Sequence, residues 1–135
     1  MGTEDIRWKQ RYTNFTKVFN HLEAALKIES PDIVQKAGII HFFEICVELS
    51  WKVMKDYLEN QGFIDVKSPR SAIKKAFEVG LIENGHIWME LIIDRNLTTH
   101  MYDEQKATEL ENIIKIKYFP VLAGLKNTFS NLTES

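Results

Sequence analysis

The sequence predicts an all-α fold: an antiparallel, up-and-down bundle of four or five helices, built as one domain over residues 1–135 and expected to dimerise. Three observations lead to this prediction. Only three prolines and six glycines interrupt the chain. Apolar residues recur at spacings of three and four, as on one face of a helix. No stretch alternates apolar and polar residues long enough to indicate a sheet, and 135 residues are enough for one core.

The first helix is predicted over residues 4–28. Its large apolar residues follow helical spacing and form a single stripe that can face a core. They are Trp8, Tyr12, Phe15, Phe19, Leu22 and Leu26.

The second helix is predicted from Pro31 to Gln61. Ser30 suits the N-cap, Pro31 the first helical position, and Gly62 the C-terminal stop. The apolar residues of this segment cover more than one stripe, so we expect the helix to be central in the bundle and also to lie against another subunit. They are Ile39, Ile40, Phe42, Phe43, Ile45, Val47, Leu49, Trp51, Val53, Met54, Tyr57 and Leu58.

Two shorter helices follow. Ser68 and Pro69 repeat the start signal, and the third helix should end near Gly80. Its partly solvated surface carries three basic residues: Arg70, Lys74 and Lys75. The fourth helix is predicted over residues 84–97, with four core candidates: Ile87, Trp88, Leu91 and Ile92.

The final helix is predicted to begin after Asp103, which suits an N-cap. Pro120 should kink or restart this helix, because proline lacks the backbone donor of the helical ladder. The polar tail over residues 127–135 is expected to fray. The core candidates of the final helix are Ala107, Leu110, Ile113, Ile114, Ile116 and Leu122.

Charge and cysteine content narrow the possible environments. The net charge of −2 provides no general field for a long nucleic acid, although a few arginines and lysines could form a local RNA site. No apolar run approaches a membrane span, and the N-terminus lacks a signal-peptide core. Cys46 is the single cysteine, and a buried free thiol fits a reducing compartment. We therefore expect a cytoplasmic protein.

Several chemistries are disfavoured. A di-iron bundle needs two Glu-x-x-His elements, whereas this chain has one, from Glu83 to His86, with Gly85 inside it. We expect no metal and no other cofactor. Cys46 has no adjacent cation to activate it as a nucleophile. The phosphate-binding glycine loops and the Gly-Ser with paired aspartates of a nucleotidyltransferase are absent, so any nucleotide transfer needs another protein as catalyst.

The segment from Arg95 to Tyr102 concentrates the chemical potential of the chain. Arg95 can hold a phosphate, and His100 can move a proton near neutral pH. The Tyr102 hydroxyl can act as a nucleophile, a proton donor or a site of modification. The alternative is structural: Arg95 pairs with Asp94 or Glu90, His100 caps or packs, and Tyr102 is half-buried.

The spacing of these residues does not suit one regular helix. His100 follows Arg95 by five residues, which places the two roughly 140° apart around a helix. The preceding helix should therefore end near Leu97, Thr98 and Thr99, where adjacent β-branched residues favour a change of conformation. An irregular turn, or pairing with a second copy across a two-fold axis, could bring the groups together.

Charged residues also recur at helical spacing along the second helix: His41, Glu44, Glu48, Lys52, Lys55 and Glu59. One interpretation is a solvated face on which Glu48 and Lys52 form a favourable pair. In the other, Glu44 or Glu48 enters a polar site and orients Arg95 or His100.

Three segments together resemble a known family. The first comprises Phe43-Glu44 and the run from Glu48 to Lys52, continuing to Leu58; the second begins at Ser68-Pro69-Arg70 and ends at Gly80. The third, Asp94 to Tyr102, contains Arg-x4-His-x-Tyr. With these motifs the chain resembles the HEPN superfamily, in the branch of nucleotidyltransferase substrate-binding proteins that includes the HepT toxins.

The resemblance implies a homodimeric helical bundle that works with a minimal nucleotidyltransferase, the MntA-like antitoxin of toxin–antitoxin pairs. It implies that Arg95 and His100 act in metal-independent RNA cleavage, with Asn96 in the same site. It also implies that Tyr102 accepts AMP from the partner, which silences the nuclease. Candidate supporting residues are Glu44, Glu48 and Asp94. The alternatives are a non-catalytic nucleotide- or substrate-binding subunit and a purely structural dimeric adaptor.

Overall fold

The computed structural model describes residues 3–96 and 102–134, and within these ranges every regular element is helical, which confirms the all-α prediction. The elements in chain order are α1 (Thr3–Leu26), α2 (Ile33–Asn60), α3 (Pro69–Glu78), α4 (Gly85–Asp94), α5 (Glu104–Ile113), the π-helical turn η2 (Ile114–Tyr118) and α6 (Phe119–Glu134). Residues 95–96 continue α4 as a 3₁₀ turn. The predicted helix end near Leu97, Thr98 and Thr99 lies outside the described residues.

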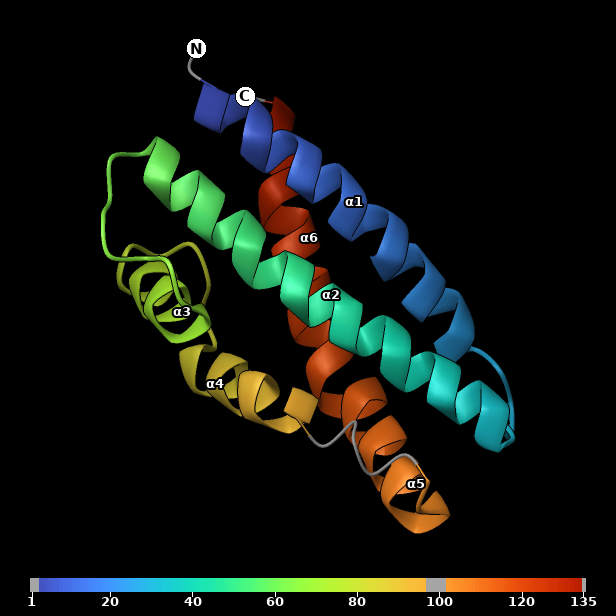
Figure 1. The fold of residues 1–135 in the computed structure, drawn as a ribbon. Coiled ribbons are helices and arrows are strands. Elements are labelled where there is room, and N and C mark those ends of the chain that lie inside the picture. The colour runs from blue at the N-terminus through green and yellow to red at the C-terminus, as the bar shows by residue number, and fades with distance from the viewer. Residues whose placement is uncertain (1–2, 97–101, 135) are drawn as a thin grey trace.

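The long helices α1 and α2 form an antiparallel pair, and α2 is central (Figure 1). Helix α6 crosses behind α2 and returns toward the start of α1, while α3 and α4 lie on the side of α2 that faces away from α1. The two ends of the chain therefore lie at the same end of the bundle. The central position of α2 agrees with its apolar residues, which cover more than one face.

The predicted start of the second helix is wrong. Ser30 has φ +48°, in the left-handed region, and the helix begins at Ile33 after an Asp32 N-cap. Asp32 Oδ1 accepts the backbone N–H of Gln35 at 2.8 Å, and Gln35 Oε1 accepts the backbone N–H of Asp32 at 2.9 Å. This reciprocal capping box satisfies two donors, whereas a start at Ser30-Pro31 would leave Gln35 without that role.

The other helix signals are confirmed. Ser68 caps α3 through the backbone N–H of Ser71, with Pro69 at the first helical position. Asp103 caps α5 through the backbone N–H groups of two following residues. Gly62 and Gly80 follow α2 and α3 with φ of +95° and +79°, a conformation that glycine adopts without steric cost.

Pro120 restarts the last helix, as predicted, by means of the π turn. The Phe119 N–H donates to the carbonyl of Ile114, so the ladder widens one turn before the missing proline donor. The extra residue in the turn changes which side chains face inward. Tyr118 is buried, whereas Ile113 and Ile116 are 37% and 76% exposed. The prediction that these two isoleucines belong to the core is therefore wrong.

The polar tail is helical to Glu134, so the prediction that residues 127–135 fray is wrong for the described part of the tail. Phe129 explains the difference because it is fully buried. Its ring lies 5.6 Å from Trp8 and 5.5 Å from Tyr57, between α1 and α2. The Tyr12 hydroxyl also donates to the Lys126 carbonyl at 2.7 Å. Tertiary packing thus orders a segment whose composition alone favours fraying.

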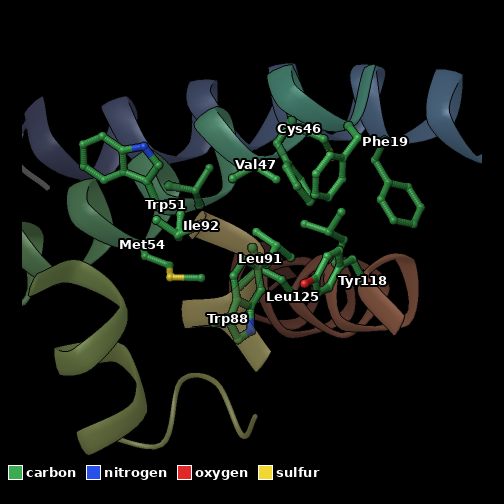
Figure 2. Close-up of a cluster of buried hydrophobic side chains, with 14 of the residues drawn as sticks. Phe19, Cys46, Val47, Trp51, Met54, Trp88, Leu91, Ile92, Tyr118 and Leu125 are labelled. Carbon is green, nitrogen blue, oxygen red and sulfur yellow. The ribbon is translucent and has the colours of Figure 1, made fainter. Parts of the chain in front are cut away.

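The core lies where α1, α2, α4, η2 and α6 converge (Figure 2). Of the four core candidates in α4, Trp88, Leu91 and Ile92 are buried, and Ile87 packs against them from a half-buried position. Cys46 is fully buried, and this burial raises the pKa of its thiol. A protonated, enclosed thiol agrees with the expectation that Cys46 is a poor nucleophile.

A buried carboxylate joins α1 to α2. Asp56 is 1% exposed, and its Oδ2 accepts Arg11 Nε at 3.0 Å. Lys55 Nζ lies 3.1 Å from the other carboxylate oxygen of Asp56.

Within the described ranges, no helix is long and apolar enough to cross a membrane.

Candidate functional site

Arg95 at the end of α4 is held by Glu48 of α2. Arg95 Nη1 donates to Glu48 Oε2 at 2.9 Å, and the Arg95 side chain is 23% exposed. Glu48 therefore contacts Arg95, as one interpretation of the charged face of α2 expects, while the exposed Glu44 and the Lys52 pair agree with the other interpretation, a solvated face. Because a guanidinium carries five N–H donors, Arg95 can hold this carboxylate and an anion at the same time.

Glu48 also forms the predicted pair with Lys52, whose Nζ lies 3.3 Å from Oε1. Partial burial raises the pKa of the Glu48 carboxyl, but the neighbouring Trp51 and Lys52 side chains lower it. The positive charges of Lys52 and Arg95 add to this effect, so the pKa lies below its ordinary value. Glu48 is therefore a carboxylate at neutral pH.

The carboxylates that could have paired with Arg95 contact other groups. Asp94 Oδ2 accepts a hydrogen bond from the Tyr118 hydroxyl, and Glu90 Oε2 pairs with Lys117 Nζ. Both contacts join α4 to η2. Asp94 therefore secures the backbone next to Arg95 and does not bind the guanidinium itself. The structural alternative, in which Arg95 pairs with Asp94 or Glu90, is wrong.

The structure leaves the other predicted residues in three different situations. Tyr102 is 85% exposed just before the Asp103 cap, so the half-buried alternative is wrong. Glu44 is exposed and makes no hydrogen bond or ion pair with the residues described here. His100 lies outside the described residues. The structure thus brings Arg95 together with Glu48 and leaves Glu44 apart.

A pocket of about 250 Å³ lies beside Arg95, between the start of α3 and the end of α4. It is lined by Ser68, Pro69, Arg70, Ile92, Ile93, Arg95 and Asn96. Sequence reasoning placed Arg70 on a solvated surface and did not connect it to this site. Ser68-Pro69-Arg70 stood out as a motif, but only the fold brings α3 against α4.

The described residues contain no group of three or more histidine, cysteine, aspartate or glutamate side chains that could hold a metal ion. Arg95 provides a fixed cation that is oriented by the Glu48 carboxylate, and it lies beside a pocket that is also lined by a second cation, Arg70. This arrangement can bind a phosphate and stabilise negative charge on it.

Residues 10–131 match the family described as "Nucleotidyltransferase substrate binding protein like". The chain belongs to this family. The chain is 37% identical over 84 residues to a curated relative, a Haemophilus influenzae protein named "Probable ribonuclease HepT". That alignment covers 57% of this chain and 58% of the relative, so the chain spans less than two thirds of that relative's length.

Two solved structures share the fold of this nucleotidyltransferase substrate-binding family member. A crystal structure of a Thermus thermophilus protein superposes with a TM-score of 0.73 at 27% identity, covering 90% of this chain and 99% of that one. A Haemophilus influenzae structure superposes with a TM-score of 0.74 at 26% identity, covering 86% and 96% of the two chains. The second is described as having the fold of a substrate-binding domain of a nucleotidyltransferase.

Proposed function

We propose that this protein is the HEPN-type partner of a separate minimal nucleotidyltransferase. In this proposal it is a metal-independent RNase toxin that the MntA-like partner silences by transferring AMP to Tyr102. The observation that carries the proposal is Arg95, held by Glu48 at the head of the Arg-x4-His-x-Tyr motif. The family and the HepT relative support it.

The cleavage chemistry needs no metal because RNA carries its own nucleophile. The ribose 2′-oxygen attacks the neighbouring phosphorus and loses its proton to a base, while the 5′-oxygen leaves and takes a proton. His100 is suited to either proton transfer because imidazole titrates near neutrality. Arg95 stabilises the charge that develops on the phosphoryl oxygens, with Asn96 in the same site. The products are a 2′,3′-cyclic phosphate and a 5′-hydroxyl.

A homodimer would supply two copies of His100, one for each proton transfer. Exposed large apolar side chains on α4, α5 and η2 support contact with a second copy: Ile93, Ile113 and Ile116. Sedimentation velocity should give the mass of two chains. Replacing Ile93 and Ile116 by glutamate should shift the protein to the mass of one chain and reduce RNA cleavage.

The nuclease proposal is tested with purified protein and single-stranded RNA in excess EDTA. Wild type should cleave the RNA, and Arg95→Ala and His100→Ala should each reduce the rate by at least a hundredfold. Arg7→Ala, which removes an exposed arginine of α1, is the matched control and should cleave as wild type does. Equal rates in all four proteins would exclude this mechanism.

AMP transfer is tested separately by co-expression with the nucleotidyltransferase. The Tyr102 oxygen would attack the α-phosphorus of ATP, pyrophosphate would leave, and the phenol proton would pass to a base of the partner. The exposure of Tyr102 supports access by another enzyme. Intact-mass analysis should show added AMP on wild type and none on Tyr102→Phe. AMP on Tyr102→Phe would assign the modification to another residue.

A second candidate function is a non-catalytic nucleotide- or substrate-binding subunit of a two-component nucleotidyltransferase. The description of the Haemophilus influenzae structure and the pocket beside Arg95 favour it. Calorimetric titration with ATP or AMP distinguishes the two functions. Nucleotide binding that is lost in Arg95→Ala, in a protein that cleaves no RNA, would support the second candidate.

A further inference from the structure

We infer that Arg70 is a second phosphate-binding residue, and that the pocket between α3 and α4 takes an RNA phosphate adjacent to the one held by Arg95. This inference rests on the proposed function, because it assigns part of the same substrate to a further subsite. It starts from two arginines, Arg70 and Arg95, that line one pocket of about 250 Å³.

The composition of the pocket favours an anion. Arg70 lines the pocket from the first turn of α3, and Arg95 from the end of α4. The other polar side chains of the lining are Ser68 and Asn96, and no lining residue carries a carboxylate. Two cations that share a pocket repel each other, and a bound phosphate replaces this repulsion with two charge-assisted contacts.

The partners of the two arginines differ. Glu48 holds Arg95 from the α2 side, which offsets one positive charge and orients the group. Arg70 is exposed, and it makes no hydrogen bond or ion pair with any residue in the described ranges. A guanidinium with this freedom, next to an oriented one, can close on a ligand phosphate as a bidentate donor.

The pocket is larger than a single ion requires. Its volume of about 250 Å³ is many times the roughly 10–15 Å³ that a single water needs. Ile92 and Ile93 form an apolar wall on the α4 side, and Ile93 is half exposed. A nucleotide unit suits such a pocket, because it offers a phosphate to the arginines and a sugar to the apolar wall. We therefore assign an RNA backbone to the pocket in preference to a free inorganic anion.

The test measures RNA binding by fluorescence anisotropy, with a labelled single-stranded RNA and every variant made in the His100→Ala background so that substrate is not consumed. Arg70→Ala should raise the Kd about tenfold and lower the magnitude of the salt-dependence slope by about 0.7, the value for one lost phosphate contact on a single strand. Arg70→Lys should recover part of the affinity, because it keeps the charge and loses the fork geometry.

Lys74→Ala is the matched control. Lys74 is an exposed cation one turn further along α3, and it lines a different pocket. The control should stay within twofold of the parent. Equal Kd values for Arg70→Ala and Lys74→Ala would overturn the inference, whether both variants bind RNA as the parent does or both bind it more weakly. Competition with inorganic phosphate provides a further arm, since displacement of RNA by phosphate at equal concentration would reassign the pocket to the free anion.

Failure of the proposed function is read from a different measurement. RNA binding could be weakened by Arg70→Ala and not by Lys74→Ala, while the protein with native His100 cleaves no RNA in EDTA. That result would support the phosphate subsite and refute the nuclease proposal. If cleavage occurs and Arg70→Ala binds RNA as the parent does, the nuclease stands and the subsite does not.

Discussion

The hydroxyl of Tyr118 donates a hydrogen bond to Asp94, the residue immediately before Arg95. Tyr118 is the last residue of the π turn, it is 1% exposed, and its ring stacks on Phe43 at 5.7 Å. The widened turn before Pro120 therefore places a phenol in the core, where it secures the end of α4. The candidate site depends on this contact because Arg95 extends from the secured backbone.

Tyr118→Phe should destabilise the protein by about 1.5–3 kcal/mol, because it removes a hydrogen bond to a charged acceptor and leaves Asp94 without it. Chemical denaturation near neutral pH measures this change. Tyr102→Phe, in an exposed position, should leave the free energy of unfolding unchanged within about 0.5 kcal/mol. A neutral effect of Tyr118→Phe would show that the contact contributes nothing to stability.

The raised pKa of Tyr118 leads to a second prediction: the free energy of unfolding should decrease at alkaline pH. Burial, and after it the Asp94 hydrogen bond and charge, raise the pKa of Tyr118 above its ordinary value. The folded state therefore keeps this proton where the unfolded state loses it, and the contribution to stability decreases as pH rises above about 10. Between pH 9 and pH 11, about one unit below and one unit above that value, the melting temperature should fall less steeply with rising pH for Tyr118→Phe than for wild type. Identical slopes would contradict the prediction.

Glu48→Gln tests whether orientation of Arg95 matters for activity. The amide keeps the shape and loses the charge, so we expect the single-turnover cleavage rate to fall about tenfold, the size of one charge-assisted contact. Because the folded pKa of Glu48 is lowered, its contribution is present at neutral pH and is lost as pH falls through that pKa. Glu44→Gln, one turn earlier on α2 and exposed, is the control and should cleave as wild type does.

Asp56→Asn should lower the free energy of unfolding by about 2–3 kcal/mol, because it removes a buried charge from its two cations. The cost stays at the low end for a buried pair, since Arg11 and Lys55 are 29% and 20% exposed and can reach water. Urea denaturation checks the value. Glu29→Gln, at an exposed position, should change it by less than about 0.5 kcal/mol.

Phe129→Ala should destabilise the fold by about 3–5 kcal/mol, the usual cost of removing a buried aromatic ring. The ring lies between Trp8 and Tyr57, so its loss separates α6 from α1 and α2. Hydrogen exchange should show amides after residue 126 becoming less protected. Asn127→Ala, in the same helix, is the control; if it destabilised as strongly, the effect would be due to the helix itself and not to the ring.

Local signals in the sequence were enough to predict where most of the helices begin and end. Ser68-Pro69, Asp103, Gly62 and Gly80 act through contacts within a few residues, so their roles can be predicted without a fold. The start of α2 was predicted wrongly because Ser30 and Asp32 are both good caps. The reciprocal contact with Gln35 decides between them.

The sequence by itself determined the helical class, most helix boundaries, the apolar stripe of α1 and the motif that begins at Arg95. Only the tertiary structure decided that the tail is ordered by Phe129, that Ile116 faces outward, that Glu48 and not Glu44 holds Arg95, and that Arg70 shares the pocket. Caps and periodicity depend on neighbours in the chain. These later features depend on contacts between residues on different helices, far apart in the chain, or on the register of one π turn, and such contacts have no local signature.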